Sequence, residues 1–150
     1  MTIKELQNKI KNISSAIERG VQTSLQDAGS EAVDRNVAQM EKHGQNSRGG
    51  SLKNPRTGDT KYASPEYAEY KSMLGRESRF INLNLTGDFH RSMDFKVTKG
   101  GIDIFATDDK TDRLIKAYGM QIFGLNDENF DWLFDEVFEG LFTELKSYLS

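Results

Sequence analysis

Apolar residues in the first third of the chain recur with the period of a straight α-helix, about 3.6 residues per step. They fall at Ile3, Leu6, Ile10, Ile13, Ile17, Val21, Leu25, Ala28 and Ala32. Thr2 and Glu5 have the spacing of a capping box at the start of this pattern. The sequence therefore predicts a helical arm over residues 1–43.

Without a break, such an arm would be about 60 Å long, which is longer than a globule of 150 residues needs. We therefore expect part of it to project or to pack on another subunit. Gly20 and Gly29 each weaken a helix interior by about 1 kcal/mol relative to alanine and offer places to bend. A two-helix hairpin is the alternative to one continuous helix.

Residues 44–61 lose the helical period and are rich in Gly, Asn, Ser, Lys and Arg, which predicts a loop. A loop of this length is either a mobile insertion or a functional arm. Its bases Arg48, Lys53 and Arg56 are candidate interface residues. The basic residues that could contact phosphates are few, and only Tyr62, just beyond the loop, could stack on a nucleobase. We therefore do not expect direct DNA binding. Contact with an acidic protein surface, or a solvated loop, is favoured.

Residues 62–150 combine helical and strand patterns. The predicted order is a helix from Pro65 to a stop at Gly75, a half-exposed strand at 80–85, a hairpin of strands 94–98 and 102–107 around Lys99-Gly100-Gly101, a helix at 109–118, a return to the sheet at 120–125 and a last helix from Asn126. We therefore predict a single α+β domain over residues 1–150. It comprises the long N-terminal helix, a small antiparallel sheet of three or four strands, and a C-terminal amphipathic helix packed on that sheet.

The last predicted helix has a broad apolar stripe and an acidic remainder. The apolar positions are Phe130, Leu133, Phe134, Val137, Phe138, Leu141, Phe142, Leu145 and Tyr148. Residues 127–150 hold seven acids against one base, whereas the 44–61 loop is basic. Such separation of acidic and basic residues suits subunits that meet head to tail. A solvated loop and a solvated helix face would give the same distribution of charge. Trp132, outside the centre of the stripe, is either an exposed interface anchor or a half-buried residue at the core edge.

A short apolar run, a Thr-Gly stop and a short helix form a joint at residues 83–93, Leu-Asn-Leu-Thr-Gly-Asp-Phe-His-Arg-Ser-Met. Gly87 permits backbone angles that other residues avoid, and Phe89 should pack in the core. His90 and Arg91 are expected on the polar side of the short helix, where they are candidate interface residues. The plain alternative is a strand-to-helix turn of the kind found in any small α+β domain.

With the elements that follow it, this joint resembles the phage virion-morphogenesis and tail-completion family, whose members carry an L-x-x-TG-x-L-x-x-S-like block. The resemblance covers roughly residues 62–150, since the block is followed by the hairpin, Tyr118-Gly119, Phe123-Gly124-Leu125 and a closing amphipathic helix. Two features depart from the family pattern. Phe89 replaces the usual aliphatic residue, and the Arg-Pro pair common before the last helix is absent.

The resemblance implies a structural tail-completion or head-to-tail joining subunit, located at the neck or tail end of a phage virion and synthesised in the bacterial host cytoplasm. The implied partners are identical subunits in a six-fold ring, portal, adaptor or head-closure proteins, and tail-tube or terminator proteins. One alternative is a morphogenesis or scaffolding factor that leaves the finished virion. Another is an adaptor that binds nucleic acid through the basic loop.

The residue types present do not suggest an enzyme or a cofactor site. The chain has no cysteine, which excludes disulfides, thiolate metal ligands and a cysteine nucleophile. His43 and His90 do not form a metal-spaced pair. No apolar run approaches the roughly 20 residues of a membrane span. We therefore expect a binding protein without catalytic residues, cofactor, metal or membrane contact.

Overall fold

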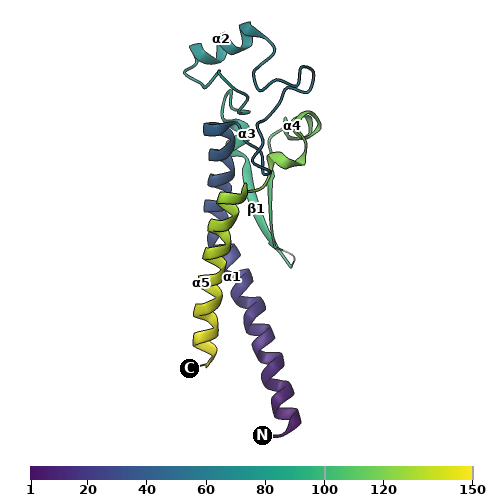
Figure 1. The fold of residues 1–150 in the computed structure, drawn as a ribbon, viewed down its shortest axis with the longest axis vertical. Helices are drawn as coiled ribbons and strands as arrows, with labels where there is room; N and C mark the ends of the chain where they lie inside the picture. Colours follow the sequence, from purple (N-terminus) through teal and green to yellow (C-terminus); the bar gives the residue numbers. More distant parts are fainter. Residues whose placement is uncertain (100, 150) are drawn as a thin grey trace.

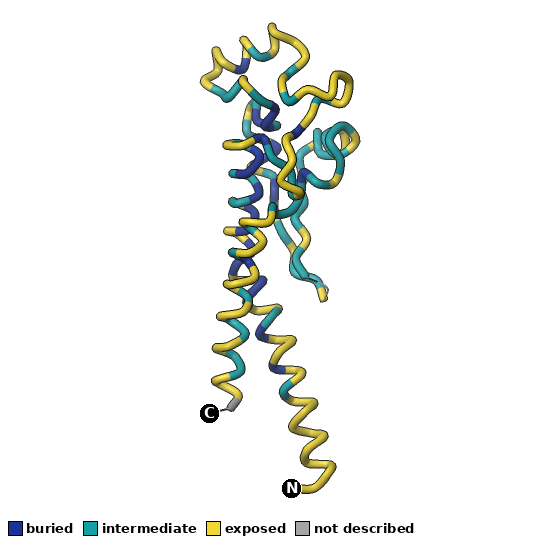
Figure 2. Tube along the Cα trace, viewed as in Figure 1, coloured by how far each residue is buried: buried dark blue, intermediate teal, exposed yellow. Residues whose placement is uncertain are grey.

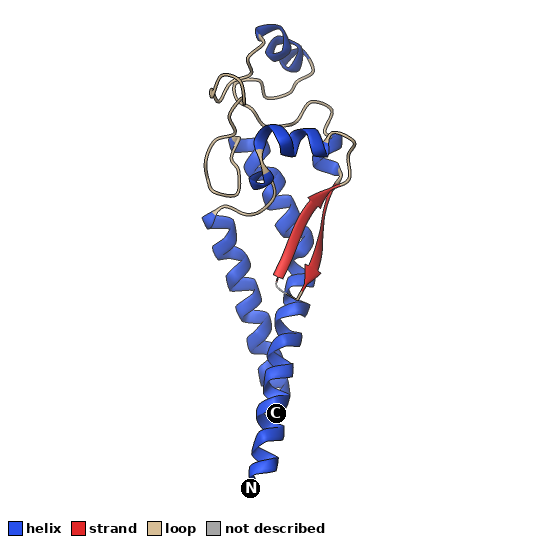
Figure 3. Cartoon of the chain, turned by 90° about the vertical axis from the view of Figure 1, so that its right-hand side faces the viewer, coloured by secondary structure: helices blue, strands red, loops and turns tan. Residues whose placement is uncertain are grey.

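The computed structural model describes residues 1–99 and 101–149, which form an elongated stem with a head at one end (Figure 1). The elements in chain order are α1 (Ile3–His43), α2 (Pro65–Met73), α3 (Asp88–Arg91), β1 (Met93–Thr98), β2 (Gly101–Ala106), α4 (Thr111–Tyr118), the 3-10 helix η1 (Met120–Ile122) and α5 (Asp127–Leu149). Helices α1 and α5 form the stem, and the hairpin of β1 and β2 lies along α1 (Figures 1 and 3). The predicted α+β class is confirmed.

Helix α1 is one continuous helix of 41 residues. Its start has the predicted capping box, in which Glu5 N donates to Thr2 Oγ1 at 3.1 Å and Thr2 N donates to Glu5 Oε2 at 2.6 Å. Its end is capped by Gly44, whose φ of 59° lies in the left-handed region that favours glycine. The continuous helix is therefore confirmed, and the two-helix alternative is wrong.

Glycines of the stem lie at positions of close packing. A β-carbon at Gly29 of α1 would overlap the ring of Phe95 on β1. One at Gly140 of α5 would likewise overlap the side chain of Ser24 on α1. The absence of a side chain at these positions lets the hairpin and α5 lie directly against α1.

The core is organised around α1. Its larger cluster joins α1 to the head and the hairpin, and consists of Val33, Met40, Leu52, Ile81, Phe89, Met93 and Ile122. A smaller cluster, farther from the head, joins Leu25 and Ala28 of α1 to Leu133 of α5, with Val97 and Ile102 of the hairpin at its edge. Helix α5 therefore packs along α1 and also meets the hairpin.

The sheet has two strands, so the prediction of three or four strands is wrong. β1 and β2 pair antiparallel, with Met93 opposite Ala106 and Val97 opposite Ile102. The predicted hairpin is thereby confirmed. Its predicted turn, Lys99-Gly100-Gly101, lies partly outside the described residues.

The segment at 80–85 is not a strand, because its asparagines point inward. Asn82 and Asn84 are buried, and Leu83 between them has a left-handed φ of 59°. Asn82 Nδ2 donates to the Glu41 carbonyl at 3.4 Å, and Asn84 Nδ2 donates to Glu41 Oε1 at 2.9 Å. The alternating pattern predicts amides that face solvent, whereas both of them bind the last turn of α1.

The segment between α4 and α5 is not a strand either. Its backbone groups form hydrogen bonds with side chains of α1 instead of with a neighbouring strand. Asn36 accepts from Gly124 N at 2.9 Å and donates to the Ile122 carbonyl at 3.0 Å. Gln39 donates to the Gly124 carbonyl at 2.7 Å and accepts from Asn126 N at 3.1 Å. Both amide side chains are buried. We call these four hydrogen bonds the amide clamp.

Asn36→Leu should lower the free energy of unfolding by about 2 to 4 kcal/mol, because a leucine of similar size leaves the Gly124 N–H and the Ile122 carbonyl unpaired in the core. Asp34→Leu, at an exposed position on the same turn of α1, is the control and should change stability by less than about 0.5 kcal/mol. Urea unfolding measures both values. Equal stability of the two variants would contradict the proposed importance of the clamp.

Candidate interaction surfaces

The basic loop of residues 44–61 lies in the head, and its candidate interface residues Arg48, Lys53 and Arg56 are all exposed. The loop is anchored by Leu52, which is buried in the main core. Arg48 and Lys53 line one surface hollow together with residues of α4 and η1, whereas Arg56 does not line it. The structure thus brings two of the three predicted bases together.

The Thr-Gly joint has the backbone that its sequence predicts. Gly87 has a φ of 86°, and Phe89 is buried in the main core. Arg91 is exposed and pairs with Asp88. His90, however, is buried, so the expectation that it lies with Arg91 on an exposed polar side is wrong. Helix α3 is a single turn, in which both ring side chains face inward.

A buried polar cluster, which the sequence analysis did not identify, lies next to this joint. Lys71 of α2 is fully buried, and its Nζ donates to Tyr62 Oη and to Asn82 Oδ1, each at 2.7 Å. No carboxylate forms an ion pair with this ammonium among the described residues. Burial lowers the pKa of Lys71 to about 8 and raises the pKa of Tyr62 to about 12. The helical spacing from Tyr67 to Lys71 is the sequence signal that points to this position.

His90 adds a further polar group to the same region. Burial lowers its pKa, while the carboxylate of Glu41 acts in the opposite direction. Neither ring nitrogen makes a hydrogen bond within the described part of the chain. The imidazole is therefore neutral at neutral pH, and of the two predicted polar residues of the joint only Arg91 is available to a partner.

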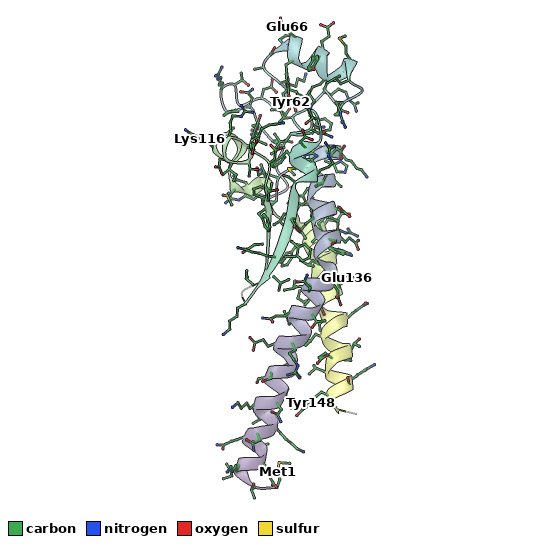
Figure 4. All side chains as sticks on the ribbon, turned by 180° about the vertical axis from the view of Figure 1, so that it is seen from behind. Met1, Tyr62, Glu66, Lys116, Glu136 and Tyr148 are labelled. Atoms are coloured by element: carbon green, nitrogen blue, oxygen red, sulfur yellow. The ribbon has the colours of Figure 1, made fainter. Side chains whose placement is uncertain are left out.

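A pocket of about 360 Å³ opens in the head beside the joint. Its aromatic lining includes Tyr62, Tyr67 and Tyr118, and its basic residues are Lys110 and Arg113. Figure 4 shows Tyr62 inside the head. A lining of this kind suits an apolar side chain next to an acidic group of a partner protein. No three metal-binding side chains gather anywhere in the described residues.

Both helices of the stem carry many exposed residues (Figure 2), and several of these have large apolar side chains. On α5 they are Phe130, Phe134, Phe138 and Phe142, each more than half exposed, and we call this row the phenylalanine stripe. On α1 they are Ile3, Leu6, Ile10 and Ile17, which we call the arm stripe. The apolar face predicted for α5 is therefore divided, since Leu133 and Val137 pack in the stem while the phenylalanines face solvent.

Trp132 lies at the edge of the stem core, which is the second of the two alternatives for this residue. Its ring packs against the smaller core cluster and is half-buried. The guanidinium of Arg35 on α1 lies 4.1 Å from the ring centre, in the geometry of a cation–π contact. Trp132 therefore joins α5 to α1, and its indole is only partly open to a partner.

Comparison of the chain with protein-family models, with curated proteins and with solved structures finds no match. No helix in the described residues is long and apolar enough to cross a membrane.

The stability of the protein should rise with pH between about 8 and about 10 because of Lys71. Its pKa is about 8 in the folded protein and 10.5 in a solvated lysine, so in this window the unfolded chain holds the proton more strongly and deprotonation favours folding. Below pH 8 the lysine is protonated in both states and contributes no slope. The raised pKa of Tyr62 acts in the opposite direction above its ordinary value of 10.0, which sets the upper limit of the window.

Lys71→Met should remove this rise, whereas Lys116→Met, at an exposed position on α4, should retain it. Thermal unfolding midpoints of the three chains, measured across the pH window, give the comparison. The same pH slope in the Lys71→Met variant as in the unchanged chain would show that another group is responsible.

Proposed function

We propose that this chain is a structural subunit of a tailed phage particle that acts in a ring at the head-to-tail joint or the tail end. The observation that carries the proposal is the ordered likeness of residues 62–150 to the tail-completion family. The Thr-Gly joint, the hairpin, the aromatic-Gly segments and the closing helix follow one another in the family's order. The left-handed φ of Gly87 and the burial of Phe89 support the interpretation of the joint as an ordered turn that packs against the core.

The exposed apolar residues of the stem support a role in assembly. Monomeric soluble proteins rarely keep large contiguous apolar surfaces in water, and such surfaces mark sites of contact with other molecules. The basic loop in the head and the acidic helix α5 also give each subunit two regions of opposite charge. Opposite charges on separate regions favour a head-to-tail contact between identical subunits.

In this role the chain binds identical subunits in a six-fold ring, with portal, adaptor or head-closure proteins on one side and tail-tube or terminator proteins on the other. Its function is then the geometry of binding, without a cofactor and without turnover. The pocket beside the joint and the hollow at Arg48 and Lys53 are two surfaces of the head open to these neighbours.

A morphogenesis factor that leaves the finished virion is the second candidate, because exposed contact surfaces serve transient assembly equally well. Quantitative mass spectrometry of purified particles separates the two functions. We expect the chain in intact particles at the copy number of a ring. Presence in assembly lysates together with absence from purified particles would favour the second candidate, and absence from both would overturn the proposal.

Joint replacement of Arg48, Lys53 and Arg56 by serine should weaken assembly while leaving the melting curve unchanged. Exposed charges contribute roughly 0.5 kcal/mol each to a contact, so three of them correspond to about a tenfold loss of affinity. The yield of tail-bearing infectious particles is the measurement. A normal yield would exclude the loop from the interface.

The matched control replaces three exposed lysines outside the loop, Lys96, Lys99 and Lys116, and should leave the yield unchanged. DNA retention at several salt concentrations, measured on the same proteins, tests the remaining alternative. Steeply salt-dependent DNA binding that only the loop variant loses would favour a nucleic-acid adaptor.

A further inference from the structure

The phenylalanine stripe of α5 is an apolar row on an acidic helix. Its four residues recur every fourth position, and the ring centres of Phe134 and Phe138 lie 6.3 Å apart, while those of Phe138 and Phe142 lie 5.8 Å apart. The first three phenylalanines are each followed directly by an acid, Asp131, Asp135 and Glu139 respectively. From end to end the stripe is about 18 Å long at the rise of an α-helix. An occupant of this surface should therefore be apolar and basic.

The arm stripe of α1 has the matching length and the opposite charge. It runs from Ile3 to Ile17, about 21 Å along the helix. Residues 1–19 carry four bases against two acids, whereas α5 carries seven acids against one base. The first twelve residues of the chain are all exposed, so the arm stripe from Ile3 to Ile10 is not covered by any described part of its own subunit (Figure 2).

The arm stripe does not reach the phenylalanine stripe of its own chain. α1 and α5 run antiparallel, with Arg19 Nε lying 3.7 Å from Glu144 Oε1 near the end of α5. Because α1 is a single helix, the residues before this contact continue past the end of α5, and Met1 lies well beyond Tyr148 (Figures 1 and 4). Both stripes are therefore open to a second copy at the same time.

We infer that the arm stripe of one copy packs on the phenylalanine stripe of a second copy, an inference that rests on the proposed ring and names its subunit contact. Opposite charge favours this pairing. Pairing two phenylalanine stripes would instead bring two strongly acidic helices together, and pairing two arms would join two basic ones. Because the two stripes are different surfaces, the contact is heterologous and is repeated from copy to copy until a ring closes.

Two variants of the full chain test this contact. The arm variant carries Leu6→Gln and Ile10→Gln, and the stripe variant carries Phe134→Gln and Phe138→Gln. Glutamine keeps a high helix propensity, and all four positions are exposed, so both variants should melt like the unchanged chain. In sedimentation velocity the unchanged chain should associate, and each variant alone should be monomeric. A mixture of the two should form a one-to-one complex, because the arm variant keeps its stripe and the stripe variant keeps its arm.

The other possible pairings give different results. Association of the arm variant alone would mean that phenylalanine stripes pair with each other, and association of the stripe variant alone would mean that arms do. An unchanged chain that stays monomeric up to about 1 mM would exclude a second copy as the occupant. A control with Tyr70→Gln and Met73→Gln, exposed apolar residues of α2, should associate like the unchanged chain, and its failure to do so would reveal nonspecific association.

A second measurement detects the contact without weakening it. Because the chain has no cysteine, copies with Leu6→Cys or Ile10→Cys can be mixed with copies carrying Phe134→Cys or Phe138→Cys and oxidised. Mixed disulfide dimers should form in at least one combination and exceed the symmetric dimers. Their absence from all four combinations would overturn the contact.

The solution experiments test the contact between subunits, and the particle experiments test the proposed function, so each claim can be contradicted without the other. A chain that is present in virions, but whose variants do not complement each other, would retain the proposed function and lose this contact. Complementing variants of a chain that is absent from virions would retain the contact and overturn the function.

Discussion

The amide clamp between α1 and the segment before α5 determines where the stem begins. The backbone of that segment is partly buried, so its N–H and carbonyl groups need partners, and Asn36 and Gln39 provide them. Gln39 Oε1 also accepts from Asn129 Nδ2 at 3.1 Å, inside the first turn of α5. The clamp thus fixes both the entry point and the direction of α5, and the packing of the stem follows from that direction.

The head has a second buried polar cluster, which differs from the amide clamp because it contains a charged group. The amides of the clamp are neutral and reciprocally bonded, whereas Lys71 holds a positive charge in the core, where its hydrogen-bond acceptors among the described residues are Tyr62 and Asn82. Burying an ammonium without a carboxylate disfavours its charged form, which is why its pKa falls. The irregular segment around Leu83 is held by this cluster rather than by a sheet.

The sequence predicted those elements in which the apolar period alone decides the structure. α1, the hairpin and α5 belong to this group, because their apolar faces meet partners that any compact arrangement provides. The predictions of strands at 80–85 and 120–125 were wrong for one reason. A hydrophobic pattern treats amide side chains as facing solvent, but those that hold these two segments are buried, namely Asn82, Asn84, Asn36 and Gln39. The candidate site residues divide in the same way. Arg48, Lys53, Arg56 and Arg91 are exposed as expected. His90 is instead buried beside Phe89, because in the single turn of α3 Asp88 and Arg91 take the solvent side and the two residues between them face inward.

The continuity of α1 has a consequence for how its exposed end behaves. A free helix of about a dozen residues is marginal in water, because forming its first turn is unfavourable. The exposed end of α1 needs no such nucleation, since it extends a helix that is already packed from Ala16 onward. It should fray gradually from its tip, where the capping box of Thr2 and Glu5 opposes the loss of the first turn. A partner therefore meets a surface that is already shaped, and docking orders little additional chain.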